Sequence, residues 1–130
     1  MSNSEYNNIV ILGSTGSIGT QSLEVISQSS DMKVLGLSAN CNIDLLENQA
    51  RAFKPKAVAV VDVDCAADLR LRLCDTPIRV LAGSEALCEL ASMQEADTVV
   101  TAMMGSAGLA PTVAAIRARK NIALANKETL

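Results

Sequence analysis

Short apolar runs alternate with segments of helical periodicity along the chain. The runs, of about five residues each, are typical of strands buried on both faces of a sheet. They occupy 8–12, 33–37, 57–61, 97–101 and 121–125, with a shorter run at 78–81. Between the second and third runs, Leu46, Ala50 and Phe53 recur at i, i+4 and i+7, a helical spacing. The alternation predicts right-handed βαβ crossovers and an α/β fold with a parallel sheet.

Helix boundaries follow from caps and stop residues. The predicted helices run from Gly19 to about Ser29, from a cap at Asn42 to a stop at Pro55, from Asp64 to about Cys74, onward from Gly83, and onward from about Pro111.

Parallel sheets bind ligands at the carboxyl ends of their strands. We therefore expect binding residues in the loops after Leu12, Leu37, Val61, Thr101 and Ala125.

The composition narrows the chemistry that this chain can perform. Its 130 residues suffice for one domain with a buried core, and 49% are hydrophobic while only 2% are aromatic. The absence of histidine excludes catalytic histidines and histidine-ligated zinc from this chain. With a net charge of −3 and few aromatic rings for stacking, no nucleic-acid partner is expected.

The cysteines and the polar start favour a cytoplasmic protein. No two cysteines form a C-x-x-C pair, which argues against a zinc-ribbon or thioredoxin-like site. Because each lies in or beside an apolar segment, we expect all of them to be reduced thiols packed as small apolar groups. They are Cys41, Cys65, Cys74 and Cys88. Segment 1–7 is polar and is expected to be disordered, with the domain starting at residue 8, and the start lacks the positive charges of a signal peptide. No apolar run reaches the roughly 18 residues of a membrane span, so no membrane partner is expected.

A glycine-rich loop follows the first predicted strand. Its glycines, in the pattern G-x-x-G-x-x-G, are Gly13, Gly16 and Gly19. In dinucleotide-binding folds such glycines permit a tight turn, approach of a pyrophosphate to the backbone, and close packing of helix on strand. The following helix N-terminus attracts phosphate, and Ser14, Thr15 and Ser17 offer hydroxyl donors. The alternative is a strand–helix turn without a ligand.

The end of the second strand discriminates between cofactors. An NAD site usually has an acidic residue there, about 20 residues after the glycines, which binds the ribose 2′-hydroxyl. This chain has Asn40, Cys41 and Asn42 instead, and the first acidic residue is Asp44. A missing carboxylate is compatible with a 2′-phosphate, so NADP is favoured over NAD. Asn42 is equally well a helix cap or a ligand contact, and both interpretations stay open.

Three further polar or small segments lie at strand ends. Asp62-Val-Asp64 resembles a metal-binding pair, but a cap at Asp64 with Asp62 supporting the turn explains it more simply. The small residues of 101–108 have two possible roles: they let the flat ring of a ligand lie against the backbone, or they let the preceding strand pack closely against the following helix. Segment 126–128, Asn-Lys-Glu, holds either ligand contacts or an exposed helix start.

Three motifs together resemble one enzyme family. They are Gly-Ser-Thr-Gly-Ser-Ile-Gly at 13–19, Ala-Gly-Leu-x-Pro-Thr-x-Ala-Ala-Ile at 107–116, and Leu-Ala-Asn-Lys-Glu-Thr-Leu at 124–130. From about residue 8 to residue 130 the chain is similar to 1-deoxy-D-xylulose 5-phosphate reductoisomerases. The resemblance implies a Rossmann-like, doubly wound parallel sheet in three αβα layers. It also implies conversion of 1-deoxy-D-xylulose 5-phosphate to 2-C-methyl-D-erythritol 4-phosphate with NADPH and a divalent metal, in the non-mevalonate route to isoprenoids.

The resemblance also assigns roles to single residues. Lys127 corresponds to a substrate contact. The implied cofactor contacts are Gly13, Thr15, Gly16, Ser17, Ile18, Gly19, Asn40, Cys41, Asn42, Asn126 and Glu128. Asn40 and Cys41 stand where the family often has Gly and Lys or Ser, so the group that grips the 2′-phosphate is not assigned by the motif.

Family members continue beyond this length into a catalytic domain. That domain supplies metal carboxylates, a lid with a Trp, and the His and Lys that hold the substrate phosphate. We therefore expect residues 8–130 to be an NADPH-binding domain with no catalytic residue and no Mg or Mn ligand, inactive alone and part of a homodimeric enzyme. Two alternatives stay open: another NADP-dependent oxidoreductase, such as a semialdehyde dehydrogenase, and a stand-alone nucleotide-binding module.

Overall fold

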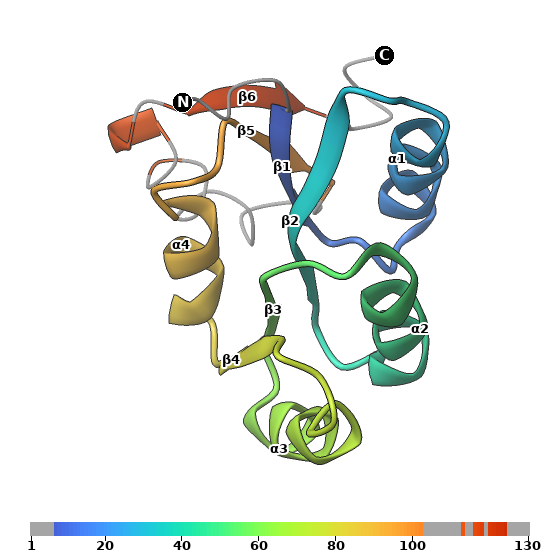
Figure 1. Cartoon of the computed structure of the whole chain (residues 1–130). Helices are drawn as coiled ribbons and strands as arrows, with labels where there is room; N and C mark the ends of the chain where they lie inside the picture. The colour runs from blue at the N-terminus through green and yellow to red at the C-terminus, as the bar shows by residue number, and fades with distance from the viewer. Residues whose placement is uncertain (1–6, 103–112, 114–115, 119, 125–130) are drawn as a thin grey trace.

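A six-stranded parallel sheet forms the centre of the protein in the computed structural model (Figure 1). The structure describes residues 7–102, 113, 116–118 and 120–124. The strands are β1 (Asn7–Leu12), β2 (Met32–Ala39), β3 (Ala57–Val60), β4 (Arg79–Ala82), β5 (Thr98–Thr101) and β6 (Asn121–Leu124). Each pairs in parallel with its neighbours in the order β4-β3-β2-β1-β5-β6. The predicted Rossmann-like, doubly wound parallel sheet is confirmed.

The strand order reverses at β1. Strands β2, β3 and β4 follow one another on one side of β1, whereas β5 and β6 lie on the other side. At the carboxyl ends, Leu12 of β1 pairs with Thr101 of β5, and Ile11 pairs with Leu37 of β2. In open α/β sheets the ligand crevice forms at such a reversal, outside the carboxyl ends of the strands. The loop after Leu12 therefore leaves the sheet at the position where a ligand is expected.

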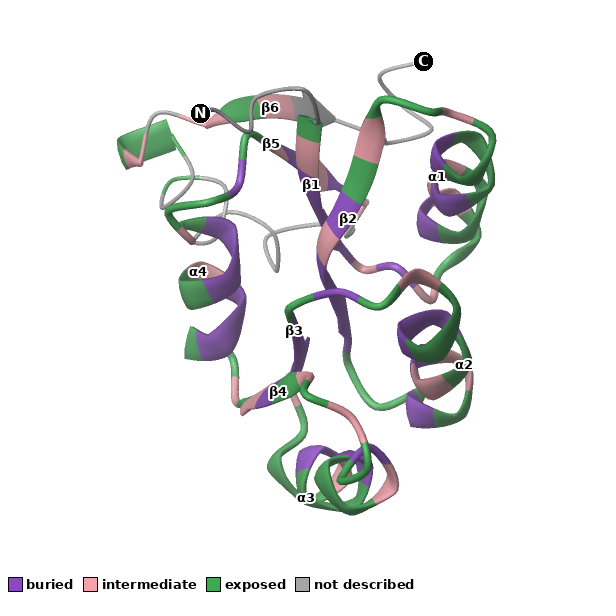
Figure 2. Cartoon of the chain, viewed as in Figure 1, coloured by how far each residue is buried: buried purple, intermediate pink, exposed green. Residues whose placement is uncertain are grey.

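Helices cover both faces of the sheet. They are α1 (Ser17–Ser27), α2 (Ile43–Phe53), α3 (Val63–Arg72) and α4 (Glu85–Ala91). Ile9 and Ile11 of β1 belong to one buried cluster with residues of α1, α2 and α3, whereas Val10 and Leu12 belong to a second cluster with residues of α4. In Figure 1, α4 lies on the opposite side of the sheet from α1 and α2. This explains why β1 is apolar at successive positions. In Figure 2 the buried sides of α1, α2 and α4 face the sheet, and their exposed sides face outward.

The core is aliphatic, as the composition requires. Val10, Ile11 and Leu12 have no exposed surface, and burying each such side chain contributes about 1.5–3 kcal/mol. Phe53 is only partly buried and packs at the margin of the core. Within the described part of the chain, no helix has the length and apolar character needed to cross a membrane.

The element boundaries differ from the predicted ones by a few residues. Asn7 belongs to β1, because its N–H donates to the Asp31 carbonyl oxygen at 2.8 Å at the start of the pairing with β2. The expectation that a disordered segment extends through residue 7 is therefore wrong at that residue, and residues 1–6 lie outside the described part. Helix α1 begins at Ser17 rather than Gly19. In the segment predicted to be helical from about Pro111, Val113 and Ile116 are described, and both are helical and exposed.

Candidate functional site

Two glycines give the loop between β1 and α1 its shape. Gly13 has a φ of 83°, in the left-handed region that favours glycine. Its carbonyl oxygen accepts a hydrogen bond from the Gly16 N–H at 3.3 Å, which closes a tight turn. At Gly19 an added Cβ would lie 2.2 Å from the Gly13 carbonyl oxygen, so only glycine lets α1 start this close to β1. The predicted structural roles of Gly13 and Gly19 are confirmed.

Gly16 plays no comparable part in the packing. The nearest atom to an added Cβ would be the Gly13 carbonyl oxygen at 3.7 Å, an ordinary contact. The φ of Gly16, −76°, suits any residue. Gly16 and Ser17 are exposed, while Thr15 and Ile18 are half-buried. The fold itself therefore does not require glycine at position 16, whereas close approach of a ligand to the backbone does.

The N-terminus of α1 differs from those of the other helices. Gly16 provides no side-chain cap, and the first turn contains no acidic residue. In contrast, Asn42 caps α2 and Asp62 caps α3, and each of these helices has an aspartate in its first turn. Helix α4 also has an acidic residue there. Among the helices whose bounds the structure describes, α1 alone presents its positive end with neither a cap nor a carboxylate, which suits an anionic ligand.

Ser14 faces away from the open side of the loop. Ser14 is fully buried, and its hydroxyl donates to Gln49 Oε1 at 2.8 Å and lies 3.2 Å from the Ser38 carbonyl oxygen. Gln49 Nε2 in turn donates to the Ser14 carbonyl oxygen at 2.9 Å. The prediction that Ser14 offers its hydroxyl to a ligand is therefore wrong, because buried partners within the protein engage that hydroxyl.

Ser38 and Gln49 are loop-supporting residues that the sequence patterns did not reveal. Ser38 Oγ accepts a hydrogen bond from the Gly13 N–H at 2.8 Å, and the Ser38 carbonyl oxygen accepts one from the Ser14 N–H at 2.9 Å. Ser38 and Gln49 are both buried. The sequence did contain a signal that Gln49 is buried, since it follows Leu46 by three residues on the apolar face of α2. A buried side-chain amide needs hydrogen-bond partners, so Gln49 could have been expected to bind another buried polar group.

The loop after β2 carries the predicted contacts to the cofactor's 2′ position. Asn40, Cys41 and Asn42 are all exposed. Because β2 pairs with β1, this loop lies beside the glycine loop at the same edge of the sheet. Asn42 Oδ1 accepts a hydrogen bond from the Leu45 N–H at 3.4 Å and caps α2. The capping role is confirmed, and a ligand contact by Asn42 stays a prediction.

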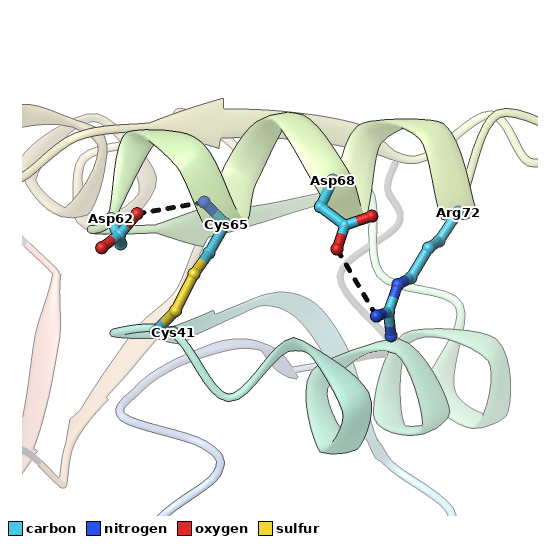
Figure 3. Close-up of a disulfide and its surroundings, with 5 residues drawn as sticks. All are labelled: Cys41, Asp62, Cys65, Asp68 and Arg72. Atoms are coloured by element: carbon cyan, nitrogen blue, oxygen red, sulfur yellow. Dashed lines mark hydrogen bonds and ion pairs between the residues drawn. A yellow bond between two sulfur atoms is a disulfide. The ribbon is translucent and has the colours of Figure 1, made fainter.

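Cys41 and Cys65 form a disulfide between the loop before α2 and the first turn of α3 (Figure 3). Their Cα atoms are 5.6 Å apart, within the usual range for a disulfide. The expectation of four reduced thiols is therefore wrong for this pair, while Cys74 and Cys88 are free. The pairing is not visible in the sequence, because the cysteines are separated by 24 positions and meet only through the parallel pairing of β2 with β3.

Asp62, not Asp64, caps α3. Asp62 Oδ1 accepts a hydrogen bond from the Cys65 N–H at 3.0 Å, and the Asp62 backbone has the extended conformation that a cap requires (Figure 3). Asp64 is the second residue of α3, within its first turn, so its predicted capping role is wrong. In the described part of the chain, Asp62 forms a cluster of potential metal ligands with Cys41 and Cys65, within 4.8 Å of one another. Since both sulfurs are in a disulfide, this cluster does not fit Mg²⁺ or Mn²⁺, which prefer oxygen ligands.

Several predicted site residues lie outside the described residues. They are Asn126, Lys127 and Glu128 after the last strand, and the loop 105–108. Strand β6 is described to Leu124, which pairs with Thr101 at the carboxyl end of β5. The described end of β6 therefore belongs to the same sheet edge as the glycine loop, and the roles of residues 126–128 stay predictions.

A surface hollow and a group of ion pairs lie at the opposite edge of the sheet. The hollow, of about 370 Å³, is lined in part by Arg51, Pro55, Asp75 and Pro77, and the prolines precede β3 and β4. Arg51 Nη2 lies 3.1 Å from Asp75 Oδ1, and the hydrogen bond from Arg51 lowers the pKa of the Asp75 carboxyl. Because the hollow opens near the amino ends of the strands, it is separate from the glycine loop.

Sequence comparisons relate residues 9–130 to one family, because a family model described as 1-deoxy-D-xylulose 5-phosphate reductoisomerase matches that range. The reductoisomerase of Agathobacter rectalis is 54% identical to the chain over 122 residues, and that of Bacteroides fragilis is 53% identical over 123 residues. Each match covers 94% of this chain and 32% of the relative. The chain therefore spans about a third of the length of the curated relatives it matches.

Solved structures have the same architecture. The reductoisomerase from Zymomonas mobilis in complex with NADPH matches with a TM-score of 0.88 and 38% identity, over 96% of this chain and 33% of that chain. A reductoisomerase crystal structure in complex with NADPH, fosmidomycin and magnesium also matches with a TM-score of 0.88 and 38% identity, over 95% of this chain and 31% of that chain. The fold described above thus corresponds to about a third of each of these larger proteins.

Proposed function

Because this chain belongs to the 1-deoxy-D-xylulose 5-phosphate reductoisomerase family, we propose that it binds NADPH as the cofactor domain of such an enzyme. The proposed domain begins with β1 at Asn7 and extends to residue 130. The complete enzyme would convert 1-deoxy-D-xylulose 5-phosphate to 2-C-methyl-D-erythritol 4-phosphate. The NADPH complex of the related Zymomonas mobilis protein supports this assignment.

One observation of this chain carries the proposal: the uncapped N-terminus of α1 begins at a glycine that the packing does not require. A helix N-terminus with unpaired N–H groups and a partial positive charge attracts phosphate. A side chain at position 16 would stand between the backbone and a pyrophosphate. The absence of an acidic residue in the first turn removes the repulsion that α2, α3 and α4 would exert on an anion.

The glycine loop would hold the pyrophosphate of NADPH. The Ser17 and Ile18 N–H groups lie in the first turn of α1, where they are available to phosphate oxygens, and the Thr15 and Ser17 hydroxyls add donors. Gly13 and Gly19 maintain the shape of the loop. When bound, NADPH supplies a hydride for reduction, and this chain's part is to bind and orient the cofactor.

The loop after β2 would select NADPH over NADH. In NAD sites a carboxylate at the end of the second strand binds the 2′-hydroxyl, and that carboxylate would repel a 2′-phosphate. At this position the chain has Asn40, Cys41 and Asn42, which carry no such charge. The neutral, exposed loop therefore favours the phosphorylated cofactor.

The remaining parts of the proposal concern the complete enzyme. Asn126 and Glu128 would contact the cofactor and Lys127 the substrate, as the motif at 124–130 implies. Mg²⁺ or Mn²⁺ would bind to residues outside this chain. We further propose a cytoplasmic, homodimeric enzyme, in which this domain without its partner domains has no turnover.

Cofactor titration by calorimetry tests the proposal directly. We expect the protein to bind NADPH more tightly than NADH, and Gly16→Val to weaken NADPH binding about tenfold or more, since it blocks charge-assisted hydrogen bonds to phosphate. Ser30→Val, in the exposed turn before β2, is the matched control and should bind normally. Tighter binding of NADH than of NADPH would overturn the cofactor assignment.

An activity assay tests the rest. The full-length gene product should oxidise NADPH with 1-deoxy-D-xylulose 5-phosphate only when a divalent metal is present. A natural product that ended at Leu130 would instead favour a stand-alone nucleotide-binding module. Unchanged activity in Gly16→Val would show that the glycine loop is not the cofactor site.

A further inference from the structure

The Cys41–Cys65 disulfide lies at the edge of the proposed cofactor site. Cys41 stands between Asn40 and Asn42, in the loop after β2, and Cys65 lies in the first turn of α3 (Figure 3). The same loop is bound to the start of α3 by the Asp62 N–H, which donates to the Asn40 carbonyl oxygen at 3.0 Å. The disulfide therefore adds a covalent connection between the proposed 2′-phosphate loop and α3.

The connection keeps a carboxylate close to this loop. A carboxylate oxygen of Asp62 and the sulfurs of Cys41 and Cys65 lie within 4.8 Å of one another, and the Asp62 side chain is exposed. In Rossmann-like folds the ribose 2′ substituent lies at the end of the second strand. A carboxylate there repels a phosphate but not a hydroxyl, and the repulsion decreases with distance. The disulfide-bonded state therefore binds NADPH less tightly than the reduced state does.

We propose that the Cys41–Cys65 disulfide is a thiol–disulfide exchange site for dithiol reductants, and that its reduction strengthens NADPH binding. This inference rests on the proposed function. Cys41 is exposed and Cys65 is half-buried, so a reductant thiolate reaches the Cys41 sulfur first. It forms a mixed disulfide with Cys41 and breaks the bond to Cys65. The second reductant thiol then displaces Cys41, so the protein gains two electrons and two protons and the reductant becomes a disulfide.

Other contacts keep α2 and α3 together after the bond is broken. Arg51 of α2 binds Asp75, which lies beyond the end of α3. Arg51 Nη1 and Nη2 each donate to one carboxylate oxygen of Asp75 at 3.1 Å. Arg72 of α3 pairs with Asp44 of α2 at 2.5 Å. Reduction therefore removes the covalent connection at Cys41 without detaching the helices from each other, while the hydrogen bond from the Asp62 N–H to the Asn40 carbonyl oxygen remains. The Cys41 side of the loop can then move away from the Asp62 carboxylate and accommodate the 2′-phosphate.

Calorimetric titration of the full-length gene product in both redox states tests this inference. Thiol titration after denaturation should find two more thiols after treatment with dithiothreitol than before it, because reduction releases Cys41 and Cys65, and this increase should be absent in Cys65→Ser. The reduced protein should bind NADPH about tenfold more tightly than the oxidised protein, the effect expected when the 2′-phosphate lies further from one like charge. The NADH affinity should change less than about twofold, since NADH has no 2′-phosphate.

Three variants separate this mechanism from a general loosening of the fold. Cys65→Ser should bind NADPH as the reduced wild type does, with or without dithiothreitol. Asp62→Asn keeps a residue suited to capping α3 but removes the charge, so the oxidised variant should bind NADPH nearly as tightly as the reduced one. The control, in which Cys74 and Cys88 are both changed to Ser, should keep the full response.

Each contrary outcome has a distinct meaning. Measurable but equal NADPH affinity in the two redox states would overturn this inference and leave the proposed function standing. A redox response that persists in Cys65→Ser, or a thiol count that dithiothreitol raises equally in wild type and Cys65→Ser, would also overturn it. Absence of NADPH binding in both states would overturn the proposed function, and this inference with it.

Discussion

Gln49 and Ser14 form two hydrogen bonds in opposite directions across the interior of the protein. Gln49 Nε2 donates to the Ser14 carbonyl oxygen at 2.9 Å, and the Ser14 hydroxyl donates to Gln49 Oε1 at 2.8 Å. Gln49 is in α2 and Ser14 is in the glycine loop, so the pair fixes the loop to a residue 35 positions further along the chain. Buried polar pairs of this kind restrict a segment to one arrangement, because any other arrangement leaves polar atoms unpaired.

Gln49→Leu should destabilise the protein and weaken NADPH binding. The substitution leaves the Ser14 carbonyl oxygen buried without its amide donor, at a cost of about 1–3 kcal/mol. Urea unfolding should show the loss in stability, and titration of the folded variant should show a higher Kd for NADPH. Asn48→Leu, on the exposed side of the same helix, is the matched control. Normal NADPH affinity in Gln49→Leu would mean that the pair supports the fold but does not position the loop.

Alanine at Gly19 and at Gly16 should have opposite consequences. At Gly19 the new Cβ would meet backbone atoms of Gly13 and Ser14 at 2.2 and 2.6 Å, so we expect a loss of about 1–3 kcal/mol. At Gly16 the nearest atom is 3.7 Å away, so stability should be almost unchanged while NADPH binding weakens. Unfolding curves and cofactor titrations of the two variants check both statements. Equal stability losses would contradict the distinction drawn between the two glycines.

Asn42→Asp should shift the cofactor preference toward NADH. Aspartate caps a helix as well as asparagine does, so the stability of α2 should be retained. The new carboxylate at the end of β2 should bind a ribose 2′-hydroxyl and repel a 2′-phosphate, lowering the ratio of NADPH to NADH affinity about tenfold or more. Asn48→Asp makes the same change of charge elsewhere on α2 and should leave the ratio unchanged. An unaltered ratio in Asn42→Asp would place the 2′ position elsewhere.

Reduction of the disulfide should lower the free energy of unfolding by about 3 kcal/mol, because the bond closes a loop between residues separated by 24 positions. Urea unfolding with and without dithiothreitol measures the difference. Cys65→Ser should unfold like the reduced wild type under both conditions. A wild type whose unfolding does not respond to dithiothreitol would indicate that the bond does not form in solution.

The Asp75–Arg51 pair should make part of the stability dependent on pH. The hydrogen bond from Arg51 lowers the pKa of Asp75 in the folded protein below its value in the unfolded chain, about 3.9. A lowered carboxyl pKa stabilises the fold above the unfolded value, and this contribution disappears as the pH falls through the folded value. Asp75→Asn should therefore be less stable than wild type at pH 7, and the difference should vanish in acid. Arg51→Met should abolish the same pH-dependent difference.

The outline of the fold and the position of the site were predictable from local patterns. The apolar runs predicted β1, β2, β3, β5 and β6, and a shorter run marked β4, because buried parallel strands are apolar at successive positions. Helical spacing, caps and stop residues predicted α1 to α4. The pattern of Gly13 and Gly19 indicated a loop whose turn and close packing tolerate no side chain. These inferences succeeded because each depends on residues that are near one another in the sequence.

The misassigned residues depend on local conformation or on distant partners. Asp62 and Asp64 are both suitable caps, and only the extended backbone at Asp62 decided between them. Ser14 resembled a phosphate donor because its partner Gln49 is distant in the sequence and its burial could not be seen.

What the amino-acid sequence determined by itself is the α/β class, the glycine loop and the absence of an acidic residue at the end of the second strand. Tertiary structure alone decided the strand order, which places the loop after β2 next to the glycine loop and brings Cys41 to Cys65. The physical reason is range: periodicity and turn chemistry act over a few residues, whereas sheet pairing joins segments far apart in the chain. The charge, burial and redox state of the residues at this site therefore depend on neighbours in space that are distant in the sequence.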